Sequence, residues 1–203
     1  MNIFLASTNQ GKIAEANSLF ASSSHRLLSI NDQQQLAALG QLLPADLEIK
    51  EDGATLTANA LLKAQAWAKH ISFPIIADDS GLLLAAFPGF PGVKSKRWLS
   101  GSDQERNQAL LAKLAETADR QAKFQTVLVL YDPETTKQQF FVREVTGQIT
   151  QQAQGGAGFG YDPLFIPDGY QQTFGQLGLK VKNKISHRAQ AWEKLMTYLA
   201  KPE

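Results

Sequence analysis

Two adjacent aspartates, Asp78 and Asp79, follow the apolar run FPIIA and precede a stretch rich in glycine and proline. On a strand their side chains face opposite sides, so only one can point into a given pocket until the chain turns at Ser80 and Gly81. Carboxylates among apolar residues need a cation or hydrogen-bond donors, and their oxygens suit Mg²⁺. The pair predicts a metal site where the strand ends, the edge at which open α/β sheets bind ligands. In the alternative, one aspartate caps a turn and the other is exposed.

A second polar segment, STNQGK, runs from Ser7 to Lys12 between an apolar strand and a helix. A helix N-terminus offers free backbone N–H groups and the positive end of the helix dipole. Hydroxyl groups, an amide, a glycine and a lysine at this place predict a phosphate-binding turn. It is not a P-loop, because GxxxxGK followed by Ser or Thr is absent. In the alternative, Thr8 or Asn9 only caps the helix and Lys12 is solvated.

The segment GGAGFGYDPLF, from Gly155 to Phe165, has four glycines in its first six positions. Glycines permit unusual backbone angles and close approach of a ligand, and aromatic rings offer faces to a base. We therefore predict that Phe159 and Tyr161 face a nucleobase. In the alternative, this is a hairpin tip whose aromatic side chains belong to the core.

A fourth segment, KVKNKISHRAQA, is basic. We place its cationic side chains at the start of the last helix, where positive charge opposes the helix dipole, so an anionic or acceptor-rich ligand would explain them. The residues are Lys180, Lys182, Lys184, His187 and Arg188. For Lys180 and Lys184 a solvated basic face is the alternative.

Strands and helices alternate along the chain, which predicts an α/β domain. We expect strands over NIFLAS, HRLLSI and FPIIADD, the last ending at the aspartates, and a long hairpin around Asp132-Pro133, which suggests a mixed sheet. Helices are expected after STNQGK and from Thr55, and the stretch from Gln33 to Gln41 is helix or loop. Ser102 and Glu105 form a capping-box pattern before another helix. Ser186 is the expected N-cap of the last one.

Composition narrows the function further. The 203 residues allow one domain, or two small lobes with a shared core, and 20 basic against 19 acidic residues give a net charge of +1. So small a net charge produces no overall electrostatic field that could hold a nucleic acid or an acidic membrane, so we expect neither as a partner. With no cysteine, disulfides, thiolate metal sites and a cysteine nucleophile are excluded. Neither a leader nor a membrane span is evident, which favours the cytoplasm.

Taken together, the four segments resemble the inosine triphosphate pyrophosphatase family, which includes the bacterial dITP/XTP pyrophosphatases. The likeness runs from Leu5 to Ala191 with the motifs in family order. The family's SxNxxK pattern is met by Ser7, Asn9 and Lys12, and its ADDSGL…PGxxSxR pattern by Ala77 to Leu82 with Pro91, Gly92, Ser95 and Arg97. Its FGYDPxF pattern is met by Phe159 to Phe165, and its SHRxxA pattern by Ser186 to Ala189 with Ala191.

The resemblance implies an α/β fold with an elongated mixed β-sheet flanked by helices, and two lobes with a central active-site cleft. Residues 1–203 would form a single nucleoside-triphosphate pyrophosphatase domain and assemble as a homodimer. It also implies Mg²⁺-dependent hydrolysis of ITP, dITP and XTP at the α-phosphorus, which yields the monophosphate and pyrophosphate. Such an enzyme would remove deaminated purines from the nucleotide pool.

Site residues carry over from the family position by position. Asp79 would be metal ligand and proton acceptor, and Ser80 would contact substrate. The triphosphate would be bound by Ser7, Thr8, Asn9, Gln10, Gly11 and Lys12, and the nucleotide by Phe159, Gly160, Tyr161, Asp162, Lys182, His187 and Arg188. Where many members carry an acidic pair, this chain has IKEDG, with Lys50 at the position assigned to the metal. The second ligand could be Glu48, Glu51 or Asp52, and we favour Glu51.

Selectivity has a physical basis that does not depend on the resemblance. Inosine and xanthosine present a 6-oxo acceptor where adenine presents an amino group, so donors from His187 or Arg188 would be left unpaired by adenine. The ranking of ITP, dITP and XTP, and the choice between Mg²⁺ and Mn²⁺, stay open.

Two other functions compete with this one. The related septum-associated pyrophosphatases act on pyrimidine or modified nucleotides, but their N-terminal pattern favours SxSPRR, and this chain has STNQGK. A non-catalytic nucleotide- or RNA-binding module could use Phe159, Tyr161 and the C-terminal lysines. Such a module would lack the broad basic surface typical of RNA binding, and its binding would not depend on Mg²⁺.

Overall fold

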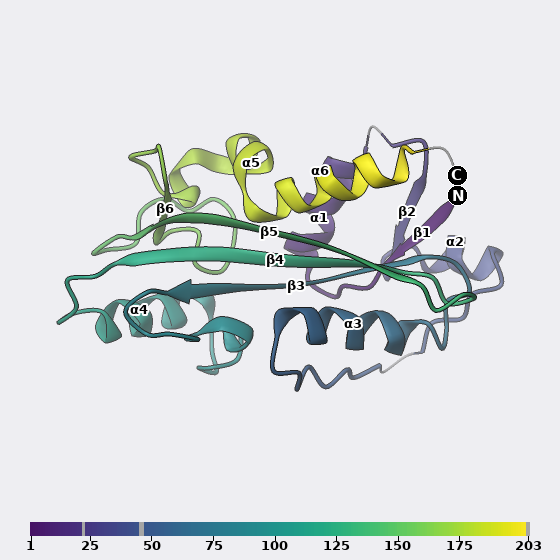
Figure 1. Ribbon diagram of the computed structural model, residues 1–203, viewed down its shortest axis with the longest axis horizontal. Helices are drawn as coiled ribbons and strands as arrows, with labels where there is room; N and C mark the ends of the chain where they lie inside the picture. The colour runs from purple at the N-terminus through teal and green to yellow at the C-terminus, as the bar shows by residue number, and fades with distance from the viewer. Residues whose placement is uncertain (22, 45–46, 202–203) are drawn as a thin grey trace. The chain divides into compact units, whose positions relative to one another are not determined.

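A mixed six-stranded sheet flanked by helices forms the fold of the computed structural model, which describes residues 1–21, 23–44 and 47–201 (Figure 1). In chain order the elements are β1 (Asn2–Leu5), α1 (Gln10–Phe20), β2 (Arg26–Ser29), α2 (Gln33–Ala38), α3 (Leu56–Trp67), β3 (Ile75–Leu84), the 3₁₀ helix η1 (Gly92–Lys94), α4 (Asp103–Lys113), β4 (Gln121–Tyr131), β5 (Gln138–Ile149), β6 (Phe165–Pro167), α5 (Phe174–Ile185) and α6 (His187–Leu199).

The strand order in the sheet is β2-β1-β3-β4-β5-β6. β1 pairs in parallel with both β2 and β3, whereas β5 and β6 pair antiparallel. β4 and β5 are hydrogen-bonded neighbours joined by a short turn in which the Asp132 N–H donates to the Lys137 carbonyl. The predicted α/β class, the mixed sheet and the long hairpin are therefore confirmed. None of the described helices is long and apolar enough to cross a membrane.

The chain divides into two compact units. Unit 1 consists of Met1–Asp79, Thr126–Val142 and Ala191–Glu203, and unit 2 of Ser80–Gln125 and Arg143–Gln190. Each unit has its own buried apolar cluster.

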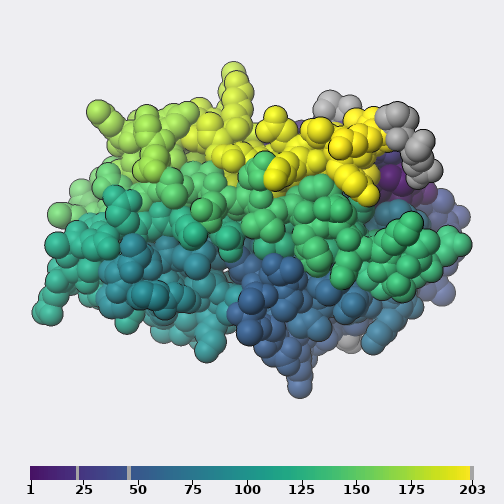
Figure 2. Space-filling model, in the orientation of Figure 1, coloured from purple at the N-terminus to yellow at the C-terminus, as the bar shows by residue number. Residues whose placement is uncertain are grey.

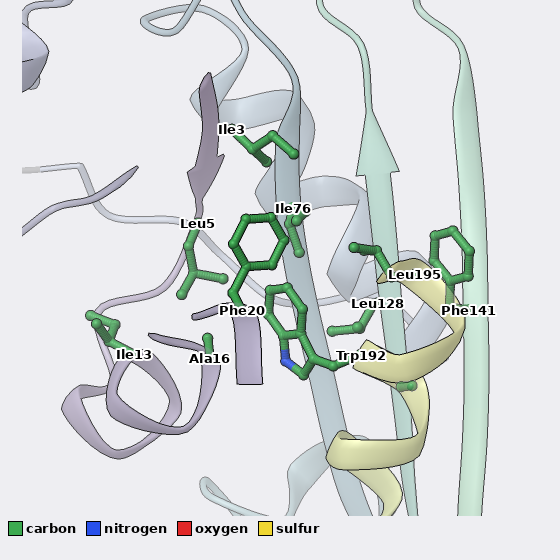
Figure 3. Packing of buried hydrophobic residues seen from close by; sticks show 11 residues of the cluster. Ile3, Leu5, Ile13, Ala16, Phe20, Ile76, Leu128, Phe141, Trp192 and Leu195 are labelled. Atoms are coloured by element: carbon green, nitrogen blue, oxygen red, sulfur yellow. The ribbon is translucent and has the colours of Figure 1, made fainter. Parts of the chain in front are cut away.

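The core of unit 1 lies between its strands and two helices, α1 and α6 (Figure 3). Ile3, Leu5 and Ile76 alternate on one face of β1 and β3 and meet Phe20 and Trp192, whose rings pack edge to face at 5.8 Å. Figure 2 shows the outer side of α6 in yellow, where every residue described as exposed is polar or aromatic. This is the pattern of an amphipathic surface helix.

α3 covers the other face of the unit 1 strands (Figure 1). Phe4, which points away from Ile3 and Leu5, packs against Trp67 of α3 with ring centroids 4.9 Å apart. The helix begins where the Thr55 hydroxyl accepts from the Ala58 N–H. α1 begins in the same way, with the Asn9 side chain accepting from the Lys12 N–H.

In unit 2, Leu110 of α4, its C-cap residue Leu114 and Phe174 of α5 join a cluster that also contains Phe124 and Phe165. The predicted capping box of α4 is present, because Ser102 and Glu105 satisfy each other's backbone N–H groups. Ser186 caps α6 as expected, with its hydroxyl accepting from the Ala189 N–H at 3.2 Å.

Two predictions about elements are wrong. β3 does not end at the aspartates but continues to Leu84, and Gly81 makes no turn. A Cβ on Gly81 would press against the Gly92 carbonyl, so glycine is required there by the close approach of the segment around η1. That segment is fastened to β3 by Ser95, whose Oγ accepts from the Leu82 N–H and donates to the Gly92 carbonyl.

The second error concerns the basic segment. Lys180, Lys182 and Lys184 lie in α5, not at the start of the last helix, and the last two occupy the final turn of α5. Cations in a final turn are favoured by the helix dipole, so the argument that they oppose it fails for the lysines. It holds only for His187 and Arg188, which open α6.

Candidate active site

Asp78 and Asp79 point to opposite faces of β3, as predicted, and each meets a different helix of unit 1. On the α1 face the Asp78 carboxylate forms an ion pair with Lys12 Nζ at 2.7 Å. On the α3 face Asp79 accepts from Asn59 Nδ2 at 3.1 Å and lies 3.8 Å from Lys63 Nζ. The two aspartates therefore do not share one cation between them, and each is compensated by its own lysine.

Asp79 belongs to a buried cluster of charges. Lys63 Nζ also lies 3.5 Å from Glu51 Oε2, so one ammonium group faces two carboxylates. Burial raises the pKa of Asp79 above its usual value and the Glu51 charge adds to the rise, whereas Lys63, Lys12 and the Asn59 hydrogen bond lower it in part. Additional positive charge at this place would stabilise the ionised pair.

Asn59 links Asp79 to the backbone of the segment that carries Glu51. It is fully buried, donates to Asp79, and accepts from the Gly53 N–H at 2.8 Å. A Cβ on Gly53 would press against Asn59 Oδ1, which explains a glycine there. The segment that carries Glu51 is thereby fixed beside Asp79.

The two carboxylates that face Lys63 provide part of a binding site for a hard divalent cation. Mg²⁺ in nucleotide enzymes is held by one or two carboxylates together with substrate phosphates rather than by a complete protein cage. Asp79 and Glu51 provide two such carboxylates, while Glu48 and Asp52 are exposed. Within residues 1–21, 23–44 and 47–201 no group of three or more histidine, cysteine or acidic side chains could hold a metal by itself. The arrangement suits a metal that arrives with phosphates.

The segment from Ser7 to Lys12 lies beside this cluster at the start of α1. Ser7 is buried and its Oγ accepts from the Asn9 N–H at 3.3 Å, while Thr8 and Gln10 are exposed and Gly11 is half-buried. Asn9 does cap the helix, but Lys12 is not simply solvated, because it pairs with Asp78. The turn places the N-terminus of an eleven-residue helix, the positive end of its dipole, beside a lysine.

Unit 2 brings together most of the residues predicted to hold the nucleoside. Asp162 is buried, accepts from the Phe159 N–H at 2.8 Å and forms an ion pair at 2.6 Å with Lys182, which is fully buried. Burial raises the pKa of Asp162, and the Lys182 ammonium group offsets part of the rise. The half-buried Phe159 ring lies 4.5 Å from Lys182 Nζ and 4.7 Å from Arg188 Cζ. The Phe159 ring is thus an aromatic surface with two cationic side chains against it.

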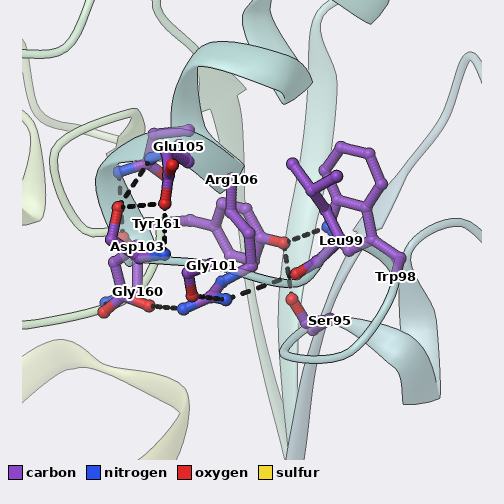
Figure 4. Close-up of polar contacts among 11 residues, drawn as sticks. Ser95, Trp98, Leu99, Gly101, Asp103, Glu105, Arg106, Gly160 and Tyr161 are labelled. Atoms are coloured by element: carbon purple, nitrogen blue, oxygen red, sulfur yellow. Dashed lines mark hydrogen bonds and ion pairs between the residues drawn. The ribbon is translucent and has the colours of Figure 1, made fainter.

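Tyr161 does not fit its predicted role. Its ring is only 5% exposed and belongs to the unit 2 core, so it offers no face to a base. Its hydroxyl donates to the Ser95 carbonyl and accepts from Trp98 Nε1, each at 2.6 Å (Figure 4). Burial raises the pKa of the phenol, although the Trp98 hydrogen bond lowers it in part. The alternative that an aromatic of this segment belongs to the core is correct for Tyr161.

The remaining predicted residues of unit 2 are His187 and Arg188 at the start of α6, Gly160 in a turn, and Ser80 in the middle of β3. His187 is buried and its ring stacks on Phe124 at 4.7 Å, and Arg188 beside it is also buried. Gly160 makes two polar contacts with α4, and Ser80 is half-buried within β3.

Sequence reasoning missed Asn59 and Lys63. They stand four positions apart on the apolar stripe of α3, with Ala60, Ala64 and Trp67, and all are buried. Two polar residues at helical spacing inside such a stripe indicate a shared partner in the interior, which here is Asp79.

Comparison with known proteins adds independent information. The model of the Ham1 family matches residues 3–198. The chain is 41% identical to a dITP/XTP pyrophosphatase of Deinococcus radiodurans, covering 96% of this chain and 90% of that protein, and 35% identical to one of Aquifex aeolicus, covering 98% and 96%. A solved HAM1 protein of Coxiella burnetii superposes over 100% of both chains with a TM-score of 0.85 at 35% identity. The Ham1 protein of Staphylococcus aureus gives 0.82 over 98% of both, also at 35% identity.

Proposed function

The chain belongs to the Ham1 family, and we propose that it hydrolyses non-standard purine nucleoside triphosphates, namely ITP, dITP and XTP, to the monophosphate and pyrophosphate. The observation that carries the proposal is that the buried Asp79 and the half-buried Glu51 both face Lys63, in a chain whose relatives are named dITP/XTP pyrophosphatases. Its cellular role would be to remove deaminated purines before they enter nucleic acid.

The phosphates and the metal bind to residues of unit 1. The triphosphate is held by Ser7 to Lys12, where the N-terminal N–H groups of α1 and the Lys12 ammonium group compensate its charge. Asp79 and Glu51 hold Mg²⁺, which when bound neutralises charge on the phosphate oxygens. Lys63 keeps the two carboxylates together in the absence of ligand.

The base that activates water is Asp79. The hydrogen bond from Asn59 fixes one of its oxygens, so the protein sets the orientation of the carboxylate that accepts the proton. The attack falls on the α-phosphorus, so that pyrophosphate leaves with its charge compensated by Lys12.

The nucleoside binds to residues of unit 2. Phe159 offers its ring to the purine, and its position is set by the buried pair Asp162 and Lys182. Arg188, which lies against the Phe159 ring, donates to the 6-oxo group, whereas the His187 ring is only 1% exposed and stacks on Phe124 in the interior. Adenine presents an amino group there, so the Arg188 donor would meet another donor, a mismatch worth on the order of 10⁴-fold in kcat/KM.

The protein acts as a homodimer, as the family resemblance implies. It acts in the cytoplasm, since its substrate belongs to the free nucleotide pool. Light scattering after size exclusion would give twice the chain mass of 22.2 kDa for a dimer. A mass equal to one chain would contradict this part of the proposal.

The decisive experiment measures pyrophosphate release from ITP, XTP, dTTP, ATP and GTP in parallel, first with Mg²⁺ and then with EDTA. We expect metal-dependent release that strongly favours ITP and XTP. Asp79→Asn serves as the matched inactive control, because it keeps the shape and removes the charge. Release of orthophosphate with a diphosphate would overturn the site of attack. Preference for dTTP would indicate a pyrimidine enzyme, and binding without turnover would indicate a non-catalytic module.

A further inference from the structure

Both backbone polar groups of Gly160 are held by side chains of α4. The Gly160 N–H donates to Asp103 Oδ2 at 2.7 Å, and its carbonyl accepts from Asn107 Nδ2 at 3.1 Å. Asp103 and Asn107 are four positions apart, so they lie on one side of the first turns of α4. One face of α4 thus hydrogen-bonds both backbone groups of the residue that follows Phe159.

Asp103 is itself fixed. Its other oxygen forms an ion pair with Arg106, a buried side chain that also donates to the carbonyls of Gly101 and Leu99 (Figure 4). Burial raises the pKa of Asp103, but the hydrogen bonds from Arg106 and Gly160, together with the charges of Arg106 and Lys96, bring the pKa below its usual value. The Asp103 carboxylate is therefore ionised at neutral pH, and in this form it accepts the hydrogen bond from the Gly160 N–H.

Between residues 155–160 and α4 the structure has an open pocket rather than close packing. A cavity of about 540 Å³ is lined by α4 on one side and by residues 155–160 on the other. Four of these six residues are glycines without side chains to fill it. The two hydrogen bonds to Gly160 therefore link this part of the segment directly to the helix, in addition to the bond by which Asp162 holds the Phe159 N–H.

We infer that Asp103 and Asn107 are positioning residues that hold the Phe159 ring in its base-binding position and so set the affinity and selectivity for the purine. The inference rests on the proposed role of Phe159 in nucleoside binding. Neither residue needs to touch the substrate, because each acts through Gly160. Tyr161, anchored to Ser95 and Trp98, fixes the segment from the other side of Gly160.

The test compares Asn107→Leu and Asp103→Ala with the conservative Asp103→Asn and with Gln34→Leu, a matched amide change at an exposed position of α2 that does not line this pocket. Asn107 Oδ1 is buried with no hydrogen-bond partner among the described residues, so an apolar replacement removes that cost and should fold. We expect KM for ITP to rise about tenfold in Asn107→Leu and Asp103→Ala, with kcat within about threefold. The preference for ITP over ATP should fall by a similar factor. Asp103→Asn, which keeps an acceptor, should recover most of the loss.

Two measurements separate this inference from the proposed function. Binding of ITP in EDTA, measured by calorimetry, should weaken about tenfold in Asn107→Leu but not in Gln34→Leu. Hydrogen exchange over residues 155–163 should accelerate in Asn107→Leu and Asp103→Ala. If the wild type turns over ITP and these variants keep its KM, selectivity and exchange, the inference fails while the function stands. If the wild type binds ITP without hydrolysis, the function fails and the binding comparison still decides the inference. A wild type that neither binds nor hydrolyses ITP overturns both.

Discussion

At the scale of single residues, Lys63 is the feature that distinguishes Glu51 from its acidic neighbours. Glu51 approaches the ammonium group that also faces Asp79, whereas Glu48 and Asp52 are exposed. A cation bound beside Asp79 would therefore find its second carboxylate at Glu51 with little movement of the chain.

We expect Glu51→Gln to raise the Mg²⁺ concentration needed for half-maximal ITP hydrolysis by roughly 10- to 100-fold, because an amide is a much weaker ligand than a carboxylate. Asp52→Asn and Glu48→Gln are the matched controls and should change it by less than about twofold. The measurement is pyrophosphate release as a function of Mg²⁺ for the variants in parallel. A larger effect of Asp52→Asn than of Glu51→Gln would place the second ligand at Asp52.

A second residue-scale prediction concerns Arg188, which is buried and lies against the Phe159 ring. Arg188→Ala removes a donor that adenine cannot use, so the ratio of kcat/KM for ITP to that for ATP should fall by at least about tenfold. Lys184→Ala, the loss of an exposed cation in α5, is the control. Thermal melts of both variants check folding, and an unchanged ratio in a folded Arg188→Ala protein would show that the base is read elsewhere.

At the scale of elements, the glycine segment works because individual glycines have separate roles. Gly158 has a φ of +83°, and a Cβ there would overlap Asp162 Oδ2, the atom that accepts from Phe159 and Lys182. Gly156 has an ordinary φ and open space around a Cβ. The two positions thus provide a matched pair of substitutions.

Gly158→Ala should destabilise the protein by roughly 2 kcal/mol or more, because the left-handed conformation costs about 1–2 kcal/mol and Asp162 must also move. Gly156→Ala should be neutral or slightly stabilising, since it only restricts the unfolded chain. Urea unfolding of both variants measures the free energies. The same Gly158→Ala variant should show a raised KM for ITP, and equal stability and KM in the two variants would mean that Asp162 does not position Phe159.

Predictability from sequence also differs by element. Helical periodicity and capping residues are sufficient to predict α1, α3, α4 and α6, and β-rich runs are sufficient to predict β4 and β5. α5 was missed because Gly175 and Gly178 weaken its helical pattern, and Gly178 takes a φ of +74° inside it. The Thr173 and Gln176 capping box would have indicated that helix.

The course of β3 could not be read from local pattern. Two aspartates followed by Ser80 and Gly81 are typical of a turn. The strand continues through them because Lys12 on one face, and Lys63 and Asn59 on the other, compensate the two carboxylates. Those partners are far away in the chain, so no local rule includes them.

At the scale of the whole molecule, three strands belong to both compact units. β3 contributes Ile75–Asp79 to unit 1 and Ser80–Leu84 to unit 2, and the unit boundary also falls within β4 and β5. Neighbouring strands are stabilised as a hydrogen-bonded ladder. Loss of one unit would therefore remove half of each of three strands from the ladder that the other unit needs.

We accordingly expect the units to unfold together despite their separate cores. Leu195→Ala, which truncates a fully buried side chain of the unit 1 cluster, should cost about 2–5 kcal/mol and lower Tm by on the order of 10 °C. Leu179→Ala, at a side chain that is 51% exposed, is the control and should change little. Pulsed hydrogen exchange along a urea titration reports on α1 of unit 1 and α4 of unit 2 separately. In Leu195→Ala both helices should lose protection at the same lowered urea concentration, because the shared strands couple them; a shift confined to α1 would show that the units unfold independently.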